Sequence, residues 1–474
     1  MGMDRRNGGV FQEIELEDNT VFVSDVTCEE MEAQDSLEVE GNLWCHGTLE
    51  SDDRVRVRDN CSIGSAELSG SLTVGGDGEI DKLNANDDVQ IGGSFNGGTV
   101  NISGSLTVGR DGKIDELEEN GGVQIGGSFE GGTADISGSL TVGKDGEIGQ
   151  LDASGSVTIG GSLNAETVDS SGSLTVGQDL ELDHLDASGS VKVGGSLRAE
   201  TVDLSHSLTV GDSLEANVLD SSGGVRVGGD LDADNIDLSG SLDVGGNLKT
   251  QVLDTSGSVH VGGDVEGGDL SLSGSLAVKG QCRADKLDSS GSIRAEQGLE
   301  VLELDASSSV KVGENLRADR IDVSGSLEVE GNLSCREGDF SGPVQVKGNM
   351  ELGEGEFSGQ LLAEKDCQGE RLHFYGKVVV GGLLNAERLK IYLCEDSSAA
   401  EVGGGRITIA QEKKRGRLKA QSIEGEELDL EAVEARVVRG NIVRIGAGCR
   451  IGLAEYTQDI EIEPGAVVEQ QVRV

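Results

Sequence analysis

Residues 189–205 read G-S-V-K-V-G-G-S-L-R-A-E-T-V-D-L-S, and this stretch decides the fold. Its apolar residues come in three pairs, each with one polar residue between the two members: Val191 and Val193, Leu197 and Ala199, Val202 and Leu204. Alternation with a period of two is typical of short strands that bury one face. Between the pairs lie turn-forming residues such as Gly194-Gly195-Ser196. The stretch therefore predicts one coil of three short strands joined by tight corners.

The same pattern returns every seventeen residues between Gly70 and Gly376. Glycine occupies most positions of this seventeen-residue grid, and Asp87, His206 and Ser308 occupy the others. A fixed short period indicates one structural unit that is stacked on copies of itself. The sequence therefore predicts an all-β fold, namely a parallel β-helix (β-solenoid) with a triangular cross-section and about 17 residues per coil.

The regularity of the grid divides the chain into three parts. Residues 1–20 are expected to form a mobile N-terminal tail. Residues 21–393 are expected to form the regular β-helix, and residues 394–474 are expected to form irregular coils with looser spacing. A basic loop at 411–417 interrupts these last coils and carries four cations: Lys413, Lys414, Arg415 and Arg417. This loop is interpreted as solvated, or as a contact for an acidic partner or for lipid headgroups.

Two regularities predict how the interior is packed. The eighth and tenth residues after a grid point are Gly78 and Ile80 in one coil, and Phe95 and Gly97 in the next. Large residues are therefore expected to stack on small ones in adjacent coils, as a narrow interior requires. Further along, three phenylalanines share one inward phase and predict an interior aromatic column: Phe340, Phe357 and Phe374.

Most of the eight cysteines fall on the same inward phases. The five that the grid places there are Cys45, Cys61, Cys282, Cys335 and Cys367. A buried lone cysteine behaves as a small apolar residue, and the usual C-x-x-C spacing of a structural zinc site does not occur. We expect reduced core cysteines in a reducing compartment, with no metal and no cofactor.

The formal net charge of -49 is organised along the chain. Fourteen residues after successive grid points stand Asp152, Asp169, Asp186, Asp203, Asp220, Asp237, Asp254, Asp288, Asp305 and Asp322. Stacked coils would place these carboxylates ~5 Å apart along one acidic edge, where each pair repels by ~1 kcal/mol in water before screening. The edge is interpreted as a solvated corner whose aspartates accept turn N–H bonds, or as a site for cations or a partner. We expect salt or divalent cations to promote assembly, and we expect no nucleic-acid partner.

The residues that could carry catalysis are scattered. The five histidines stand at unrelated phases of the repeat, so they predict neither a nucleophile–base pair nor a metal cluster. Residues 75–78 resemble the start of a calcium-binding nonapeptide, but Ile80 stands where that motif needs an aspartate. Residues 445–452 resemble one coil of a hexapeptide acyltransferase and have no histidine nearby. The protein is therefore expected not to be an enzyme, and an acyltransferase-like activity is the weakest alternative.

The two ends of a stack of strands carry unpaired backbone N–H and C=O groups. Such ends pair with those of other molecules unless they are capped, and head-to-tail contacts that do not close produce filaments. The apolar pairs nearest the two ends are Val21 and Val23, and Ile460 and Ile462. These four residues are predicted to form the joining faces of a homopolymer.

The repeated S-G-x-[LV]-x-V-x-G-x-[LV] coils over about residues 35–393 resemble the bactofilins, a family of bacterial polymer-forming cytoskeletal proteins. The segment between about residues 420 and 460 is similar to the bactofilin-like proteins of Gram-positive bacteria, through 423–428 (I-E-G-E-E-L), 438–440 (V-R-G), 445–449 (I-G-A-G-C) and 455–456 (E-Y). The resemblance implies a right-handed helix and self-assembly without nucleotide. It also implies scaffolding in cell shape, envelope synthesis or motility, with other bactofilin-like or envelope-associated proteins as partners. The chain departs from the family in its length, acidity and regularity.

The first thirty residues contain no apolar run of the kind that a secretory signal needs, and no stretch approaches the ~20 apolar residues of a membrane span. The protein is expected in the cytoplasm, or at the inner face of the membrane as a peripheral protein. A non-polymerising acidic rod or stalk that binds a partner is the alternative to the filament-forming scaffold.

Overall fold

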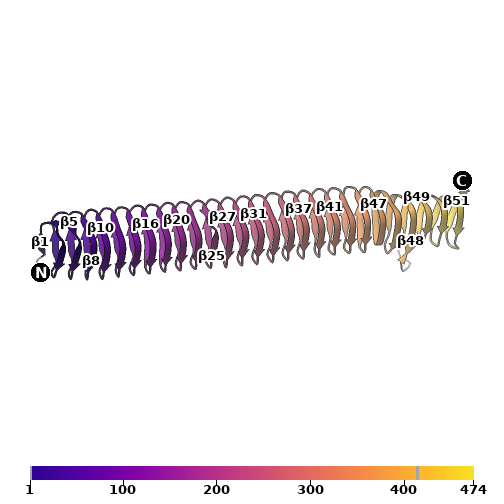
Figure 1. Ribbon diagram of the computed structural model, residues 1–474. Coiled ribbons are helices and arrows are strands. Elements are labelled where there is room, and N and C mark those ends of the chain that lie inside the picture. The colour runs from indigo at the N-terminus through magenta and orange to yellow at the C-terminus, as the bar shows by residue number, and fades with distance from the viewer. Residues whose placement is uncertain (1–2, 413–415) are drawn as a thin grey trace. The chain divides into compact units, whose positions relative to one another are not determined.

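The computed structural model describes residues 3–412 and 416–474, which form strands and turns without an α-helix. The fold is a parallel β-solenoid of about 27 turns with roughly 17 residues per turn, which confirms the predicted fold class. The strands run from β1 (Asp4–Arg6) to β52 (Val467–Arg473) (Figure 1). The chain comprises two compact units, residues 1–240 (unit 1) and 241–474 (unit 2).

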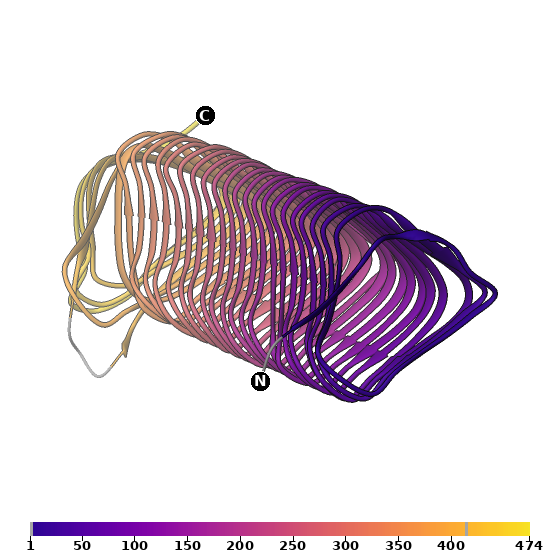
Figure 2. The same ribbon diagram turned by 90° about the vertical axis from the view of Figure 1, so that its left-hand side faces the viewer.

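Each regular coil consists of one short strand and one long strand. In residues 189–205 these are β26 (Val191–Val193) and β27 (Leu197–Leu204). The predicted second and third strands are therefore one strand that bends at Glu200 and Thr201 without a turn. In the register of β27 with β29 (Leu214–Ser221), Ala199 and Thr201 have partners and Glu200 between them has none. Seen along the stack, successive coils within a unit follow nearly the same path (Figure 2).

The long strands repeat at the coil spacing in both units. In unit 1 the regular ones are β10 (Cys61–Leu68), β12 (Gly78–Ala85), β14 (Phe95–Ile102), β16 (Gly112–Glu119), β18 (Phe129–Ile136), β20 (Gly146–Ala153), β22 (Leu163–Ser170), β27, β29 and β31 (Leu231–Leu238). In unit 2 they are β33 (Leu248–Thr255), β35 (Val265–Leu272), β37 (Cys282–Ser289), β39 (Leu299–Ala306), β41 (Leu316–Val323), β43 (Leu333–Phe340) and β45 (Met350–Phe357). Each carries alternating buried and exposed side chains, with the phase shifted at the bend.

Between Gly78 and Leu163 the interior of unit 1 alternates large and small residues, as predicted, and beyond Leu163 the same column is leucine in every coil to Leu231. Gly78 is in register with Phe95, and Phe95 is in register with Gly112 on the next strand. In the neighbouring inward column Gly97 lies between two isoleucines, and a Cβ on Gly97 would lie 2.7 Å from Val100 Cγ2. A larger residue at 97 would therefore displace the side chains around it, because the interior is close-packed.

The glycine grid marks one corner where the backbones of successive coils approach closely. A Cβ on Gly189 would lie 1.9 Å from the carbonyl oxygen of Gly172, and one on Gly274 would lie 2.1 Å from that of Gly257. Neither Gly189 nor Gly274 has a positive φ. The close approach of two backbones, and not a special backbone conformation, therefore selects glycine at these positions.

The predicted aromatic column is confirmed in unit 2. The rings of Phe340 and Phe357 stack with centroids 4.7 Å apart and an interplanar angle of 22°. Phe357 and Phe374 stack at the same 4.7 Å separation and 21°. All three side chains are buried, so the column lies inside the solenoid.

The predicted N-terminal tail is wrong for the described residues between 3 and 20, because they are part of the solenoid. β1 pairs with β4 (Thr20–Phe22), and β3 (Glu13–Leu16) pairs with β6 (Glu30–Ala33). The side chain of Leu16 is only 2% exposed. Apolar residues that continue an inward column gain burial by pairing, and this favours strands over a solvated tail.

The coils of unit 2 become unequal in length after β47 (Cys367–Leu393). The strands there are β48 (Ser397–Gln411), β49 (Leu418–Leu430), β50 (Val433–Ile445) and β51 (Arg450–Ile462). Ile407 pairs with Leu428, Leu428 pairs with Val443, and Val443 pairs with Ile460. The number of residues between paired positions differs from one pair of strands to the next. The seventeen-residue grid in the sequence is therefore lost, although the inward columns continue.

Candidate functional site

The predicted aspartates stand directly opposite one another on successive long strands. We call them, with two further members, the carboxylate ladder. In unit 1 it consists of Asp135, Asp152, Asp169, Asp186, Asp203, Asp220 and Asp237, each in register with the next. In unit 2 it consists of Asp254, Asp288, Asp305, Asp322 and Asp339, with Ser271 in the gap after Asp254. The sequence reasoning missed Asp135 and Asp339, although both obey the same spacing from Gly121 and Gly325.

The pKa values of three ladder aspartates are raised. Partial burial, and then the carboxylates of Asp152 and Asp186, raise the pKa of Asp169. The pKa values of Asp220 and Asp305 are raised for the same two reasons. A carboxyl whose pKa is higher in the folded state favours folding most at low pH, and this contribution is lost as the pH rises through the folded pKa. The ladder is therefore a line of negative charge at neutral pH, which Lys286 and Arg320 partly offset at Asp305.

A line of neighbouring carboxylates should attract cations from solution. Among residues 3–412 and 416–474, no three His, Cys, Asp or Glu side chains are placed to hold one metal ion. Carboxylates one coil apart, ~4.8 Å, gain from any cation that screens their repulsion. Assembly of copies that carry such ladders should consequently depend on ionic strength.

Neutralising part of the ladder should stabilise unit 1 and weaken its response to salt. In the variant Asp169→Asn, Asp186→Asn, Asp203→Asn, we expect the midpoint of thermal unfolding at about 0.01 M salt to rise by roughly 2–4 °C. Calorimetry at about 0.01 M and about 0.15 M salt measures this, because the Debye length falls from ~30 Å to ~8 Å between them. The control variant Glu79→Gln, Glu147→Gln, Glu181→Gln removes the same charge from non-adjacent coils. An equal rise in the control would contradict a specific effect of the ladder.

A second column of acidic and amide side chains has a structural task. It stands at the corner before the long strand, in every second coil between Asp77 and Asp179, and its side chains accept backbone N–H bonds from the next coil. Asp77 Oδ1 accepts the N–H of Ser94 at 2.8 Å, and Asp179 Oδ1 accepts the N–H of Ser196 at 2.8 Å. Further members that accept in the same way are Asn42, Asn60, Asp111, Asp145, Asn247, Asp264, Asn315 and Asn332. The interpretation of aspartates as acceptors of turn N–H bonds fits this turn column, and it does not fit the ladder.

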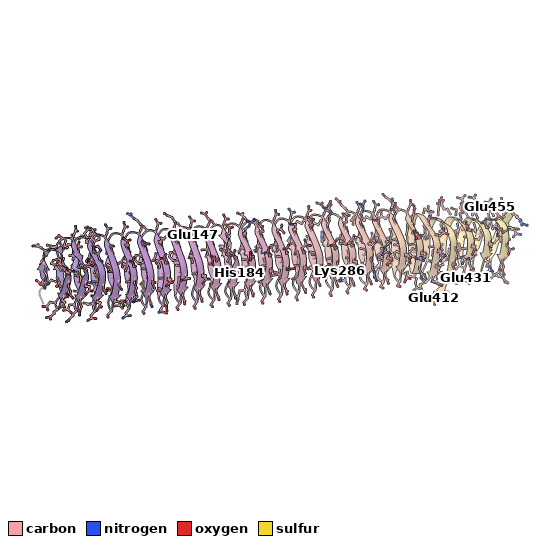
Figure 3. All side chains as sticks on the ribbon, viewed as in Figure 1. Glu147, His184, Lys286, Glu412, Glu431 and Glu455 are labelled. Carbon is pink, nitrogen blue, oxygen red and sulfur yellow. The ribbon has the colours of Figure 1, made fainter. Side chains whose placement is uncertain are left out.

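The turn column forms one wall of a groove on unit 1. The groove has a volume of 1140 Å³ and runs over the coils between Trp44 and Glu181. Its carboxylates are Asp77, Glu79, Asp111, Glu130, Asp145, Glu147, Asp179 and Glu181. Lys113 is the one cation in this lining, and it is already paired with Glu130. Figure 3 shows Glu147, one of these acids, extending outward from the coils of unit 1. We call this surface the acidic groove.

The structure corrects the predicted joining residues at the N-terminal end. Thr20 and Phe22, and not Val21 and Val23, continue the inward column of Leu37 and Val39. Val21 is buried within the stack, where it is in register with Arg5 on one side and Glu38 on the other. In the stretch T-V-F-V both pairs alternate equally well, and a shift of one residue exchanges the two faces. Val21 and Val23 therefore do not lie on the end of the stack.

The predicted residues at the other end do lie on an open surface. Ile460 and Ile462 are in register with the buried Val443 and Ile445 and so continue an inward apolar column. β52 covers only the first half of β51, and in the described part of the chain no strand pairs with the outer side of 457–462. As a result Ile462 is 39% exposed.

Three residues of the predicted basic loop, Lys413, Lys414 and Arg415, lie outside the described residues. Arg417 is half-buried, and its guanidinium lies 3.5 Å from a carboxylate oxygen of Glu434. Lys419 Nζ approaches the same carboxylate at 3.8 Å.

The cysteines are free thiols, and all are buried except Cys394, which is half-buried. This confirms the predicted inward positions. Burial raises the pKa of the Cys282 and Cys367 thiols to about 12, so both remain protonated and poorly nucleophilic at neutral pH. Among the histidines, His184 Nδ1 lies 2.7 Å from the hydroxyl of Thr201, and the ring of His373 contacts that of Tyr392. These two histidines lie in different units and have different partners.

Two curated proteins of Bacillus subtilis (strain 168) are similar to part of this chain. The uncharacterized protein YhbF is 39% identical over 99 residues, which are 20% of this chain and 42% of YhbF. The uncharacterized protein YhbE is 34% identical over 105 residues, which are 20% of this chain and 44% of YhbE. The chain thus covers less than half the length of the curated relatives it matches. No family model matches the chain, and no solved structure matches it. The described residues contain no helix that is long and apolar enough to cross a membrane.

Proposed function

We propose that this protein is a bactofilin-like scaffold whose copies assemble end to end into filaments without nucleotide. The observation that carries the proposal is the open strand edge at 457–462, where an inward apolar column reaches the surface at Ile460 and Ile462. A strand added to this edge would satisfy its backbone groups and bury both isoleucines. The fold supports the proposal because a parallel solenoid offers each copy the same strand register as its own next coil.

At the N-terminal end of the stack, the outermost backbone groups belong to the first strands of the chain. β1 and β3 each pair on one side only, with β4 and β6. The ring of Phe11 lies 6.1 Å from that of Phe22, and Ile14 and Leu16 are buried. At this end Ile14 and Leu16 are covered by their own chain, whereas Val10 is 84% exposed and Phe11 is 38% exposed. We infer that both ends contribute exposed apolar side chains to the joining of copies.

Charged substitutions at the exposed edge test this function. Ile460→Lys with Ile462→Lys should abolish filaments, because a join would then bury two unpaired ammonium groups. The measurement is electron microscopy and high-speed sedimentation of the full chain at about 0.15 M salt, where the carboxylate repulsion is screened.

Leu302→Lys provides the matched control, because Leu302 is 57% exposed within unit 2 and remote in sequence from the edge. The control should form filaments like the native chain. Filaments of native length in the Ile460→Lys, Ile462→Lys variant would refute joining through this edge. Single particles in the native chain at every salt concentration would instead favour the non-polymerising acidic rod that binds a partner.

A further inference from the structure

We propose that copies of this protein also associate side by side, with the acidic groove of one copy against a basic patch on the C-terminal coils of another. The basic patch consists of Lys419, Arg436 and Arg450, which are all exposed and line one surface region of unit 2. The partner is thus a second copy of the same chain. The side-by-side contact does not require end-to-end joining. It rests on the proposed self-assembly only because a filament would repeat the same contact along its length.

The charge of the two surfaces is complementary. The acidic groove holds eight carboxylates against one lysine, and that lysine is already paired. Around the basic patch the acidic lining is Glu434 and Glu469, and Glu434 lies 3.8 Å from Lys419 Nζ, so Arg436 and Arg450 carry most of its free positive charge. In a chain of net charge -49, most surfaces of two copies repel each other. A cationic surface is therefore a rare place where a second copy could approach the acidic groove favourably.

The spacing of the charges also matches. Glu147 is in register with Asn164, and Asn164 is in register with Glu181, so the two acids stand two coils apart. Lys419 is in register with Glu434, and Glu434 is in register with Arg450, so the two cations stand two strands apart. Both separations amount to ~9.6 Å, because neighbouring strands lie ~4.8 Å apart. Solenoids that lie alongside each other can therefore pair both charges at once.

The groove acids are available for such pairing. Glu79, Glu147 and Glu181 are exposed. Glu181 is in register with Arg198, but Arg198 pairs with Glu215 on its other side. The turn-column aspartates use one carboxylate oxygen for the neighbouring coil and keep their charge. Each exposed ion pair is weak on its own. A filament that repeats the contact along its length would gain from multivalency, and salt would reverse the association.

Charge reversal with complementation tests the contact. The groove variant carries Glu79→Lys, Glu147→Lys and Glu181→Lys, and the patch variant carries Lys419→Glu, Arg436→Glu and Arg450→Glu. At about 0.05 M salt, each variant alone should show at least tenfold less lateral bundling, roughly the loss of a few exposed pairs, by low-speed sedimentation and electron microscopy. An equimolar mixture should restore bundles, because the reversed groove then meets the reversed patch.

The matched control is Asp186→Lys, Asp203→Lys, Asp237→Lys, which makes the same charge change on the ladder of the same unit. We expect the control to bundle at least as well as the native chain. Loss of bundling in the control as severe as in the groove variant would overturn the proposal, and so would a mixture that fails to bundle. Native-like bundling by the groove variant would overturn it as well.

The test remains decisive if end-to-end filaments do not form. Sedimentation velocity would then detect the contact as salt-sensitive pairs of single particles, in the native chain and in the mixture but in neither variant alone. Loss of the end-to-end contact would lower the amount of protein in high-speed pellets, and loss of the side-by-side contact would lower the amount of bundles in low-speed pellets. The two proposals can therefore be refuted separately.

Discussion

In a Phe357→Ala variant, we expect the amide hydrogens of β43, β45 and β47 to exchange roughly 10²- to 10³-fold faster than in the native chain. Phe357 is the middle ring of the stack and contacts a phenylalanine on each side at 4.7 Å. Truncating a buried phenylalanine costs about 3–5 kcal/mol, because transfer free energy is lost and a cavity remains. Both ring pairs, each worth about 0.5–1.5 kcal/mol, are lost at the same time.

The loss should stay local, because a solenoid is stabilised by contacts between neighbouring coils. Hydrogen exchange of the full chain, followed by mass spectrometry, resolves the effect strand by strand. The strands of unit 1 should exchange at native rates. Tyr375→Ala provides the control, since Tyr375 is 43% exposed on β47 and outside the stack. Equal acceleration in both variants, or uniform acceleration along the whole chain, would contradict a local aromatic column.

Replacing the buried Glu119 should stabilise the coil around β16. Glu119 lies in an inward column between Ile102 and Ile136, which are both buried. Its Oε1 accepts the N–H of Gly121 at 2.7 Å, whereas its buried Oε2 has no hydrogen-bond partner. Other coils place neutral hydroxyls in this column, at Ser170, Ser221 and Ser289. We expect Glu119→Ile to increase the local stability at pH 7 by about 1–3 kcal/mol, the usual cost of an unsatisfied buried polar atom.

The effect of Glu119 should depend on pH in a defined direction. Burial raises the pKa of the Glu119 carboxyl above its ordinary value of 4.5, and the N–H groups of Gly121 and Gly122 only partly oppose this. The protonated carboxyl thus favours the folded state, and this contribution is lost as the pH rises from the unfolded pKa through the folded pKa. The advantage of Glu119→Ile should be largest at neutral pH and should shrink towards pH 4.5.

Hydrogen exchange of β16, corrected for the intrinsic pH dependence of amide exchange, measures this difference. Glu118→Gln is the control, because Glu118 is exposed and the change removes a charge without changing the interior. A Glu119→Ile variant that loosens β16, or whose gain is independent of pH, would show that the carboxylate is not strained in the fold.

The interior and the acidic edge could be predicted because both follow from phase alone. Phe340 and Phe374 share the phase of Phe357, and a parallel stack in register brings equal phases together. The same argument placed the cysteines inside. Phase also places Asp77 and Asp152 in different columns, seven and fourteen residues after a grid point. It could not show which of the two columns accepts a backbone N–H of the next coil, because that depends on the distance between coils at each corner.

The coil period, the inward columns and the line of ladder aspartates were determined by the sequence itself, because each depends on the spacing of residue types along one regular strand pattern. Only the tertiary structure decided that Thr20 and Phe22 face inward in place of Val21 and Val23, and that the solenoid already includes Asp4. Only it showed that Glu147 and Lys419 belong to surfaces of matching spacing. These features depend on the register between coils, and a shift of one residue, which leaves the alternation in the sequence equally good, exchanges the buried face for the exposed one.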